Sequence, residues 1–160
     1  MVPILDYNTF WNHIVEICNL DLFFLVSEES EMSSYIKEVE DDCMILVAVI
    51  PSSDTDAPDI DNIEEADSCV IFVMKKITPS NLTAAEILQV RQDTQAAITS
   101  VKNEMIKHAA DVNNDDAGTK LMRRLVIDKM HTDPEYNYLG CTGWSLSFLL
   151  KSVGIYHGII

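Results

Sequence analysis

Two uninterrupted apolar runs constrain this chain more than any other feature of its sequence. The first occupies residues 43–50 (Cys-Met-Ile-Leu-Val-Ala-Val-Ile) and is closed by Pro51, and the second occupies residues 69–74 (Cys-Val-Ile-Phe-Val-Met). Their β-branched residues and sharp boundaries favour strands over helices. A strand whose residues are apolar on both faces must have other elements packed against each face. We therefore expect the two runs to form the centre of a sheet that has other elements packed on each side.

Residues 1–40 are expected to form a helical, acidic N-terminal region. Apolar residues recur at helical spacing over 7–20 and again over 28–40. Ser27 is a suitable N-cap for the second helix, because glutamates follow it and favour the positive end of a helix dipole. The short apolar stretch 22–26 between the two helices does not favour one type of element.

The clearest helix signal follows the second apolar run. Thr83 and Glu86 match a capping box, in which the threonine hydroxyl accepts from the N3 amide and the glutamate reaches back to the N-cap. The apolar stripe behind this box predicts a long helix over 84–110 that packs on the core. Thr94 and Ala97 make the middle of the stripe small, so another element can approach closely there.

The last quarter of the chain predicts a strand and two less regular segments. Residues 119–130 are expected to form another helix, although a strand from Leu125 also fits, and residues 131–143 an irregular connection. Alternate residues over 144–151 are apolar, which predicts a half-buried antiparallel strand with its aromatic face on the long helix. Residues 152–160 form an apolar tail.

Together these elements predict an α+β fold in which residues 1–160 form a single domain. We expect one small, mostly antiparallel sheet packed against the long helix and flanking amphipathic helices. The length allows a sizeable core, and 48% apolar residues are typical of a globular protein. No apolar run approaches the ~20 residues of a membrane span, and the N-terminus lacks the basic region of a signal peptide.

The formal net charge of −15 is distributed unevenly along the chain. Residues 1–74 carry 17 acidic residues and one basic residue, Lys37, whereas residues 75–160 carry 9 acidic and 10 basic residues. This charge excludes a nucleic-acid binder of the usual basic kind, which must neutralise phosphates with lysine and arginine. The asymmetry indicates an acidic face or loop, which is either a solvated surface, a docking surface for a basic partner or a mimic of DNA phosphates.

Residues 51–68, between the two apolar runs, predict a long acidic loop. Their proline, serine and aspartate content favours a mobile hairpin loop that reaches toward a neighbour, with a helical turn over 61–66 as a further option. Asp54, Asp56 and Glu65 have the spacing of EF-hand positions 1, 3 and 12, but the required glycine is replaced, so we expect no calcium site.

No motif in the sequence predicts catalysis, a cofactor or a metal. The phosphate-binding glycine patterns and the nucleophile-elbow pattern are absent, and the four cysteines and four histidines have no metal-ligand spacing. We expect the cysteines to be reduced. We therefore predict that the protein is not an enzyme and has no catalytic, cofactor-binding or metal-binding residues.

The order of elements resembles small neck and tail proteins of tailed bacteriophages, of the tail-terminator or head–tail connector type. The residues that carry the resemblance are Val70-Ile-Phe-Val73 before the long helix, Asp133-Pro134-Glu135, Asn137, and Gly143-Trp144-Ser145-Leu146-Ser147-Phe148 at the entry to the last strand. The resemblance covers residues 40–151 in outline and leaves the helical, acidic N-terminal region unaccounted for.

The resemblance implies a non-enzymatic virion protein, made in the host cytoplasm, that forms a hexameric or dodecameric ring between the portal and the tail. Its partners would be copies of itself and other neck or tail proteins, without sequence-specific nucleic acid or membrane. A closed ring requires head-to-tail contacts between two different patches, and we expect the acidic loop of one copy to contact Arg123 and Arg124 of the next. The candidates are acidic loop residues, two adjacent arginines and the apolar chain end: Asp54, Asp56, Asp59, Asp61, Glu64, Glu65, Arg123, Arg124, Ile159 and Ile160.

Two other functions fit the same sequence. An acidic DNA mimic would inhibit a nucleic-acid enzyme, although carboxylates in a mobile loop are poorly preorganised for that role. An adaptor subunit of a contractile secretion assembly would share the ring contacts of the phage protein. The oligomeric state separates the mimic from the two ring-forming functions.

Overall fold

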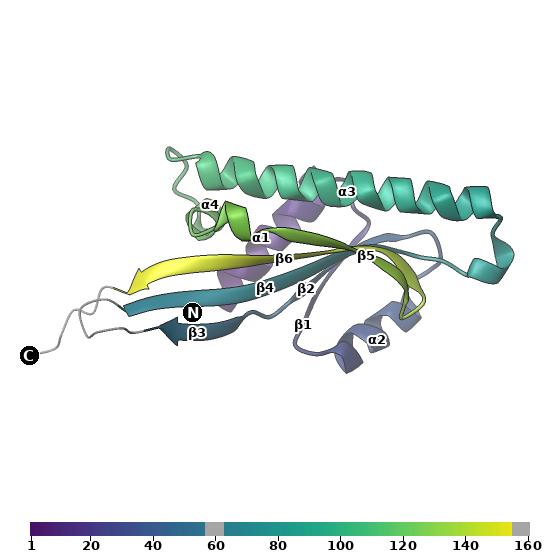
Figure 1. The fold of residues 1–160 in the computed structure, drawn as a ribbon, viewed down its shortest axis with the longest axis horizontal. Helices are drawn as coiled ribbons and strands as arrows, with labels where there is room; N and C mark the ends of the chain where they lie inside the picture. The colour runs from purple at the N-terminus through teal and green to yellow at the C-terminus, as the bar shows by residue number, and fades with distance from the viewer. Residues whose placement is uncertain (57–62, 155–160) are drawn as a thin grey trace, which may run out of the picture.

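The computed structural model describes residues 1–56 and 63–154 (Figure 1). Its helices are α1 (Ile4–Ile17), α2 (Glu29–Glu38), α3 (Ala84–Ala110) and α4 (Ala117–Met122), with the 3-10 turns η1 (Pro79–Asn81) and η2 (Ile127–Lys129). Its strands are β1 (Leu22–Val26), β2 (Met44–Val49), β3 (Ser52–Asp56), β4 (Ile63–Lys76), β5 (His131–Tyr138) and β6 (Cys141–Gly154).

The strands form one sheet in the order β1-β2-β4-β6-β5, and β3 pairs with β4 beyond the end of β2. β1 and β2 run parallel, and the other pairs are antiparallel. The two apolar runs lie in β2 and β4 at the centre, as predicted, and the short stretch 22–26 is a strand. The predicted α+β class, with a mostly antiparallel sheet and a long helix packed on it, is confirmed.

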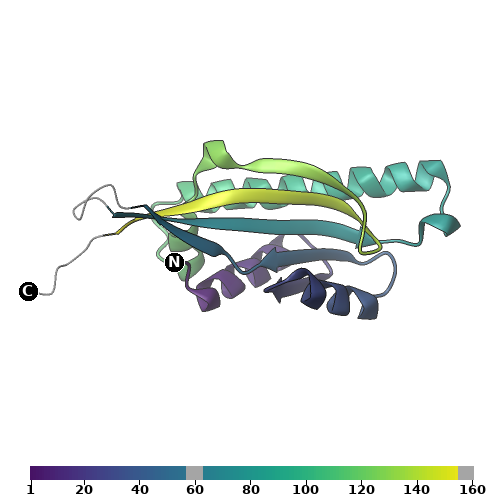
Figure 2. The ribbon, with the colours of Figure 1, turned by 60° about the horizontal axis from the view of Figure 1, so that its bottom comes forward.

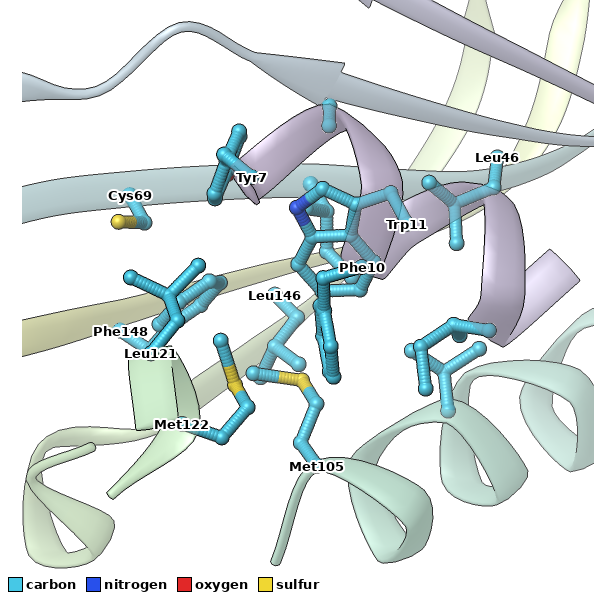
Figure 3. Close-up of a cluster of buried hydrophobic side chains, with 14 of the residues drawn as sticks. Tyr7, Phe10, Trp11, Leu46, Cys69, Met105, Leu121, Met122, Leu146 and Phe148 are labelled. Carbon is cyan, nitrogen blue, oxygen red and sulfur yellow. The ribbon is translucent and has the colours of Figure 1, made fainter. Parts of the chain in front are cut away.

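Helices cover both faces of the sheet, but unequally. α1, α3 and α4 pack on one face, where Trp11, Phe10 and Leu146 belong to the larger core cluster (Figure 3). The opposite face is covered by the ten-residue α2, over a smaller cluster that includes Met32, Ile45 and Met74. Figure 1 shows α3 and α4 on one side of the strands and α2 on the other. The expectation that β2 is covered on both faces is confirmed.

The long helix has the predicted bounds and the predicted cap. The Thr83 hydroxyl accepts from the Glu86 amide, and the Glu86 carboxylate accepts from the Thr83 amide at 2.7 Å. Thr94 is fully buried at the middle of the helix, and Trp144 of β6 donates from Nε1 to the Arg91 carbonyl at 3.5 Å. The aromatic face of the last strand therefore packs on this helix, as expected.

The prediction of a long loop over 51–68 is wrong where the chain is described. Residues 52–56 are strand β3, and residues 63–68 are the beginning of β4, which also rules out a helical turn over 63–66. These polar residues form strands because their backbone groups pair across three strands, as in the register Asp54, Ala66 and Lys151. Residues 57–62 lie outside the described residues.

Two predictions for the C-terminal part of the chain are also corrected. The helix expected over 119–130 is only α4, which is followed by η2 and by a bridge between Leu125 and Leu150. The irregular connection expected over 131–143 is β5, a turn and the first residues of β6. Pro134 is compatible with β5 because this strand lies at the sheet edge, where one row of amides needs no partner.

The N-terminal ends of the first two helices differ from those expected. The N-cap of α2 is Glu28 rather than Ser27, whose amide and hydroxyl instead donate to the Glu31 carboxylate at 2.8 and 3.0 Å. α1 begins at Ile4, and its N-cap is Pro3. All four cysteines are free thiols. Among the described residues, no helix combines the length and the hydropathy that a membrane span requires.

Candidate functional site

The described part of the acidic segment, residues 51–68, forms an arm of paired strands rather than a loop. We define the arm as β3, residues 63–68 of β4 and residues 149–154 of β6, which pair side by side. Figure 1 shows the free ends of β4 and β6 reaching beyond all four helices. Among the described residues, the sheet therefore continues as a three-stranded projection whose tip is covered by no helix.

The arm carries three of the acidic interface candidates on described side chains. Asp54 and Glu64 are exposed, Glu65 is half-buried, and Glu64 accepts from Lys151 at 3.2 Å across the strands. Asp56 closes β3. The other candidates of this kind, Asp59, Asp61, Ile159 and Ile160, lie outside the described residues.

A buried ion pair anchors the base of the arm. The Asp67 side chain is 1% exposed, and its Oδ2 accepts from Nη2 of Arg124, which is 19% exposed, at 2.5 Å. The backbone reinforces this contact, because the Lys151 amide donates to the Arg124 carbonyl at 2.8 Å. Within the described residues Asp67 Oδ1 has no hydrogen-bond partner. The carboxylate therefore depends on Arg124 for the compensation of its burial.

Sequence reasoning missed Asp67 as the partner of Arg124. A signal was present, because residues 67, 69, 71 and 73 alternate along one strand, and Cys69, Ile71 and Val73 face the larger core. An aspartate in that series must face inward and needs a cation. The sequence does not show which cation, because 57 residues separate Asp67 and Arg124.

Both arginines of the expected intersubunit contact already have partners in their own chain. Arg123 donates to the carbonyls of Asp111 and Asn114 at 3.0 and 2.6 Å and lies 3.4 Å from the Asp115 carboxylate. Arg123 thus closes the loop between α3 and α4, and Arg124 ties the residues after α4 to the arm. An intersubunit contact between these arginines and the acidic segment stays a prediction, but it would have to compete with these bonds.

The hollow between α1 and the start of α4 is lined by a carboxylate that already serves as a helix cap. It has a volume of about 490 Å³ and is lined in part by Phe10, His13 and Asp116. Asp116 caps α4 by accepting from the Thr119 amide at 2.8 Å, and this bond is the main reason why the pKa of Asp116 is lowered. Because Asp116 already caps a helix, the hollow does not present a free carboxylate to a ligand.

The pKa values that depart from their usual range do so because of helix capping or because of burial. Backbone amides lower the pKa of Glu31 and Glu86, as they do for Asp116. Burial raises the pKa of Cys69 to about 12 and that of Cys141 to about 11. Thiols with such pKa values stay protonated at neutral pH and are weak nucleophiles. Among residues 1–56 and 63–154, no three His, Cys, Asp or Glu side chains converge as metal ligands.

The edges of the sheet are the remaining open features of the described surface. β1 and β5 end the sheet, and β3 continues the line of β2 along β4. Among the described residues each of these three strands pairs with one neighbour. Unpaired strand edges are sites where another chain can add a strand. No known family model and no curated protein matches this chain.

Proposed function

We propose that this protein is a non-enzymatic structural subunit that assembles with copies of itself into a ring. The resemblance in its sequence implies that such a ring lies at the neck or tail of a bacteriophage particle, between portal and tail. The observation that carries the proposal is the arm, a paired three-stranded extension that reaches beyond the helical layers (Figure 2).

A projecting arm supports head-to-tail assembly because it makes the two ends of the molecule different. Contacts between different patches of identical chains produce either a closed ring or an open filament. The buried Asp67–Arg124 pair holds the arm to the body, as does the pairing of β6 with β4 over the whole length of both strands. A rigid attachment favours closure, because the angle between successive copies is then fixed.

The acidic charge supports a surface that does not retain nucleic acid. Asp54 on the arm and Glu28, Glu29 and Glu38 at α2 are exposed. In a ring through which DNA passes, carboxylates on the inner wall would repel the phosphates and prevent adhesion. An atomic structure of the ring tests this point directly, since these four side chains would face the channel.

The DNA mimic remains the second candidate because of one observation. Part of the acidic segment forms paired strands, so Asp54 and Glu64 are held on a regular scaffold rather than on a mobile loop. A preorganised acidic surface loses less entropy when it binds a basic partner. The two functions differ in oligomeric state, because a mimic acts without ring formation.

Electron microscopy of the purified full chain, combined with a DNA competition assay, tests the proposal. We expect closed rings of uniform diameter, built from six or twelve copies, at near-physiological salt. A protein that stays monomeric and displaces DNA from a basic nucleic-acid enzyme would overturn the ring and support the mimic.

A further inference from the structure

The outer edge of β1 is open and entirely apolar. β1 consists of Leu-Phe-Phe-Leu-Val and pairs only with β2 among the described residues. The Val26 carbonyl accepts from the Ile50 amide, so the backbone groups of Val26 point toward β2. Because these groups alternate in direction along a strand, those of Phe23 and Leu25 point away from the sheet. Two residues thus offer four backbone hydrogen-bonding groups to an additional strand.

The other open edges carry features that discourage strand addition. β5 contains Pro134 between Asp133 and Glu135, and β3 contains Asp54 and Asp56. Proline and charged residues are the usual protection of an exposed edge against pairing with another chain. β1 has no proline and no charged residue. This contrast identifies the β1 edge as the place where an added strand meets no such obstacle.

Apolar side chains flank the β1 edge on both faces of the sheet. Phe23 and Leu25 pack against the larger core cluster, on the face that α1 covers. On the other face the rings of Phe24 and Tyr35 stack 5.0 Å apart, and Tyr35 of α2 is 39% exposed. A strand placed at this edge would therefore contact apolar groups through both of its faces, so it should itself be apolar on both.

We propose that the occupant of the β1 edge is the segment 155–160 of a neighbouring copy, added as a strand. This segment reads Ile-Tyr-His-Gly-Ile-Ile, follows directly from β6 of the arm, and contains no Asp, Glu, Lys or Arg. Its isoleucines and tyrosine have high strand propensity. The inference rests on the proposed self-assembly, and it specifies the two patches that meet: the chain end beyond the arm and the edge of β1.

The register of the strands excludes that the segment 155–160 pairs with β1 of its own chain. Leu25 lies level with Ala48 of β2, which is level with Ile71 of β4. The next residue of β1, Val26, is therefore seven residues along the strands from the level of Ile63, the partner of Gly154. Seven strand residues correspond to about 23 Å along the sheet, and a strand added outside β1 lies four strand spacings, about 19 Å, from β6.

The two displacements combine to about 30 Å between Gly154 and the near end of the β1 edge. Six fully extended residues span at most ~20–22 Å. The segment 155–160 is therefore too short to pair with β1 of its own chain. In a second copy no such restriction applies, because the arm of the first copy can approach that edge directly.

Replacement of the segment 155–160 in the full chain tests this proposal. One variant replaces residues 155–160 by six glycine and serine residues, which leaves every described residue unchanged. A second variant, Leu25→Pro, removes an outward-facing amide of β1, a position at which an edge strand tolerates proline. The control is Val112→Lys, which alters an apolar residue that is 74% exposed but lies outside the proposed contact. Circular dichroism verifies the folding of each chain.

We expect native mass spectrometry to show rings for the control and monomers for each of the two variants alone. A mixture of the two variants should give 1:1 dimers that do not grow, because the Leu25→Pro chain retains the tail and the tail-replaced chain retains the edge. Rings from the tail-replaced chain would overturn this proposal and leave the proposed function intact. A wild-type chain that is itself monomeric would instead contradict the proposed function. If Leu25→Pro fails to fold, the tail-replaced chain alone decides.

Discussion

The ion pair between Asp67 and Arg124 predicts that Arg124→Met destabilises the protein strongly. Methionine keeps much of the side-chain volume but removes the cation from a carboxylate that is 1% exposed and has one oxygen without a partner. Removal of one member of a buried pair costs about 3–5 kcal/mol. The Met1 ammonium, which is 86% exposed and 3.8 Å from Oδ2 of Asp67, offsets little of this loss.

For a chain of this size, that loss corresponds to a melting temperature about 6–20 °C lower. Urea unfolding measures the free energy directly. The matched control is Lys151→Met, because the Lys151–Glu64 pair on the same arm is half-exposed and should contribute no more than about 1 kcal/mol.

The double variant Arg124→Met with Asp67→Leu completes a mutant cycle. Since both charges are then absent, it should be markedly more stable than the sum of the single losses implies. The reasoning would be refuted if Arg124→Met unfolded within about 1 kcal/mol of the wild type, or if the two substitutions were additive.

Three further predictions concern other parts of the fold. Gly143→Ala should destabilise more than an ordinary overpacking of about 1–3 kcal/mol, because the added Cβ would lie 2.1 Å from the Val73 carbonyl oxygen; a urea midpoint near that of the wild type would contradict this. Asp116→Ala should cost about 1 kcal/mol through loss of the α4 cap. Because the folded pKa of Asp116 is lowered, its contribution is present above the unfolded pKa and is lost as the pH falls through the folded pKa, so the difference between wild type and variant should vanish in acid. Cys69, buried and with a pKa of about 12, should react with a thiol reagent at pH 8 only as fast as the protein opens, and rapid labelling would contradict its burial.

Local signals explain which parts of the fold were predictable. The apolar runs in β2 and β4 and the capping box at Thr83 are contained in a few consecutive residues, so the sequence indicates them directly. The alternation over 144–151 is equally local and identified β6, although this strand begins three residues earlier, at Cys141.

The arm and β5 were missed for a different physical reason. Asp54 and its neighbours in β3 are polar on both faces, and they form a strand because Ala66 and Lys151, far along the chain, complete the pairing. β5 contains a proline and has backbone partners on only one side, so it lacks the features of a central strand. Strands of this kind are specified by pairing partners rather than by their own residues.

The interface candidates were predictable only in part. The sequence identified the acidic segment and the adjacent arginines as complementary, and the structure brings Asp67 and Arg124 together within one chain. The edge of β1 was not among the candidates, because an apolar stretch of five residues does not show whether it lies inside a sheet or at its edge.

Native mass spectrometry of the unmodified full chain tests the central claim most directly. One chain weighs 18.0 kDa, so a hexamer or a dodecamer is recognised by a mass of six or twelve times this value. We expect one of these closed assemblies to be the dominant species at near-physiological ionic strength, with no ladder of intermediate masses. A single species at 18.0 kDa over the whole range of protein concentrations would contradict it.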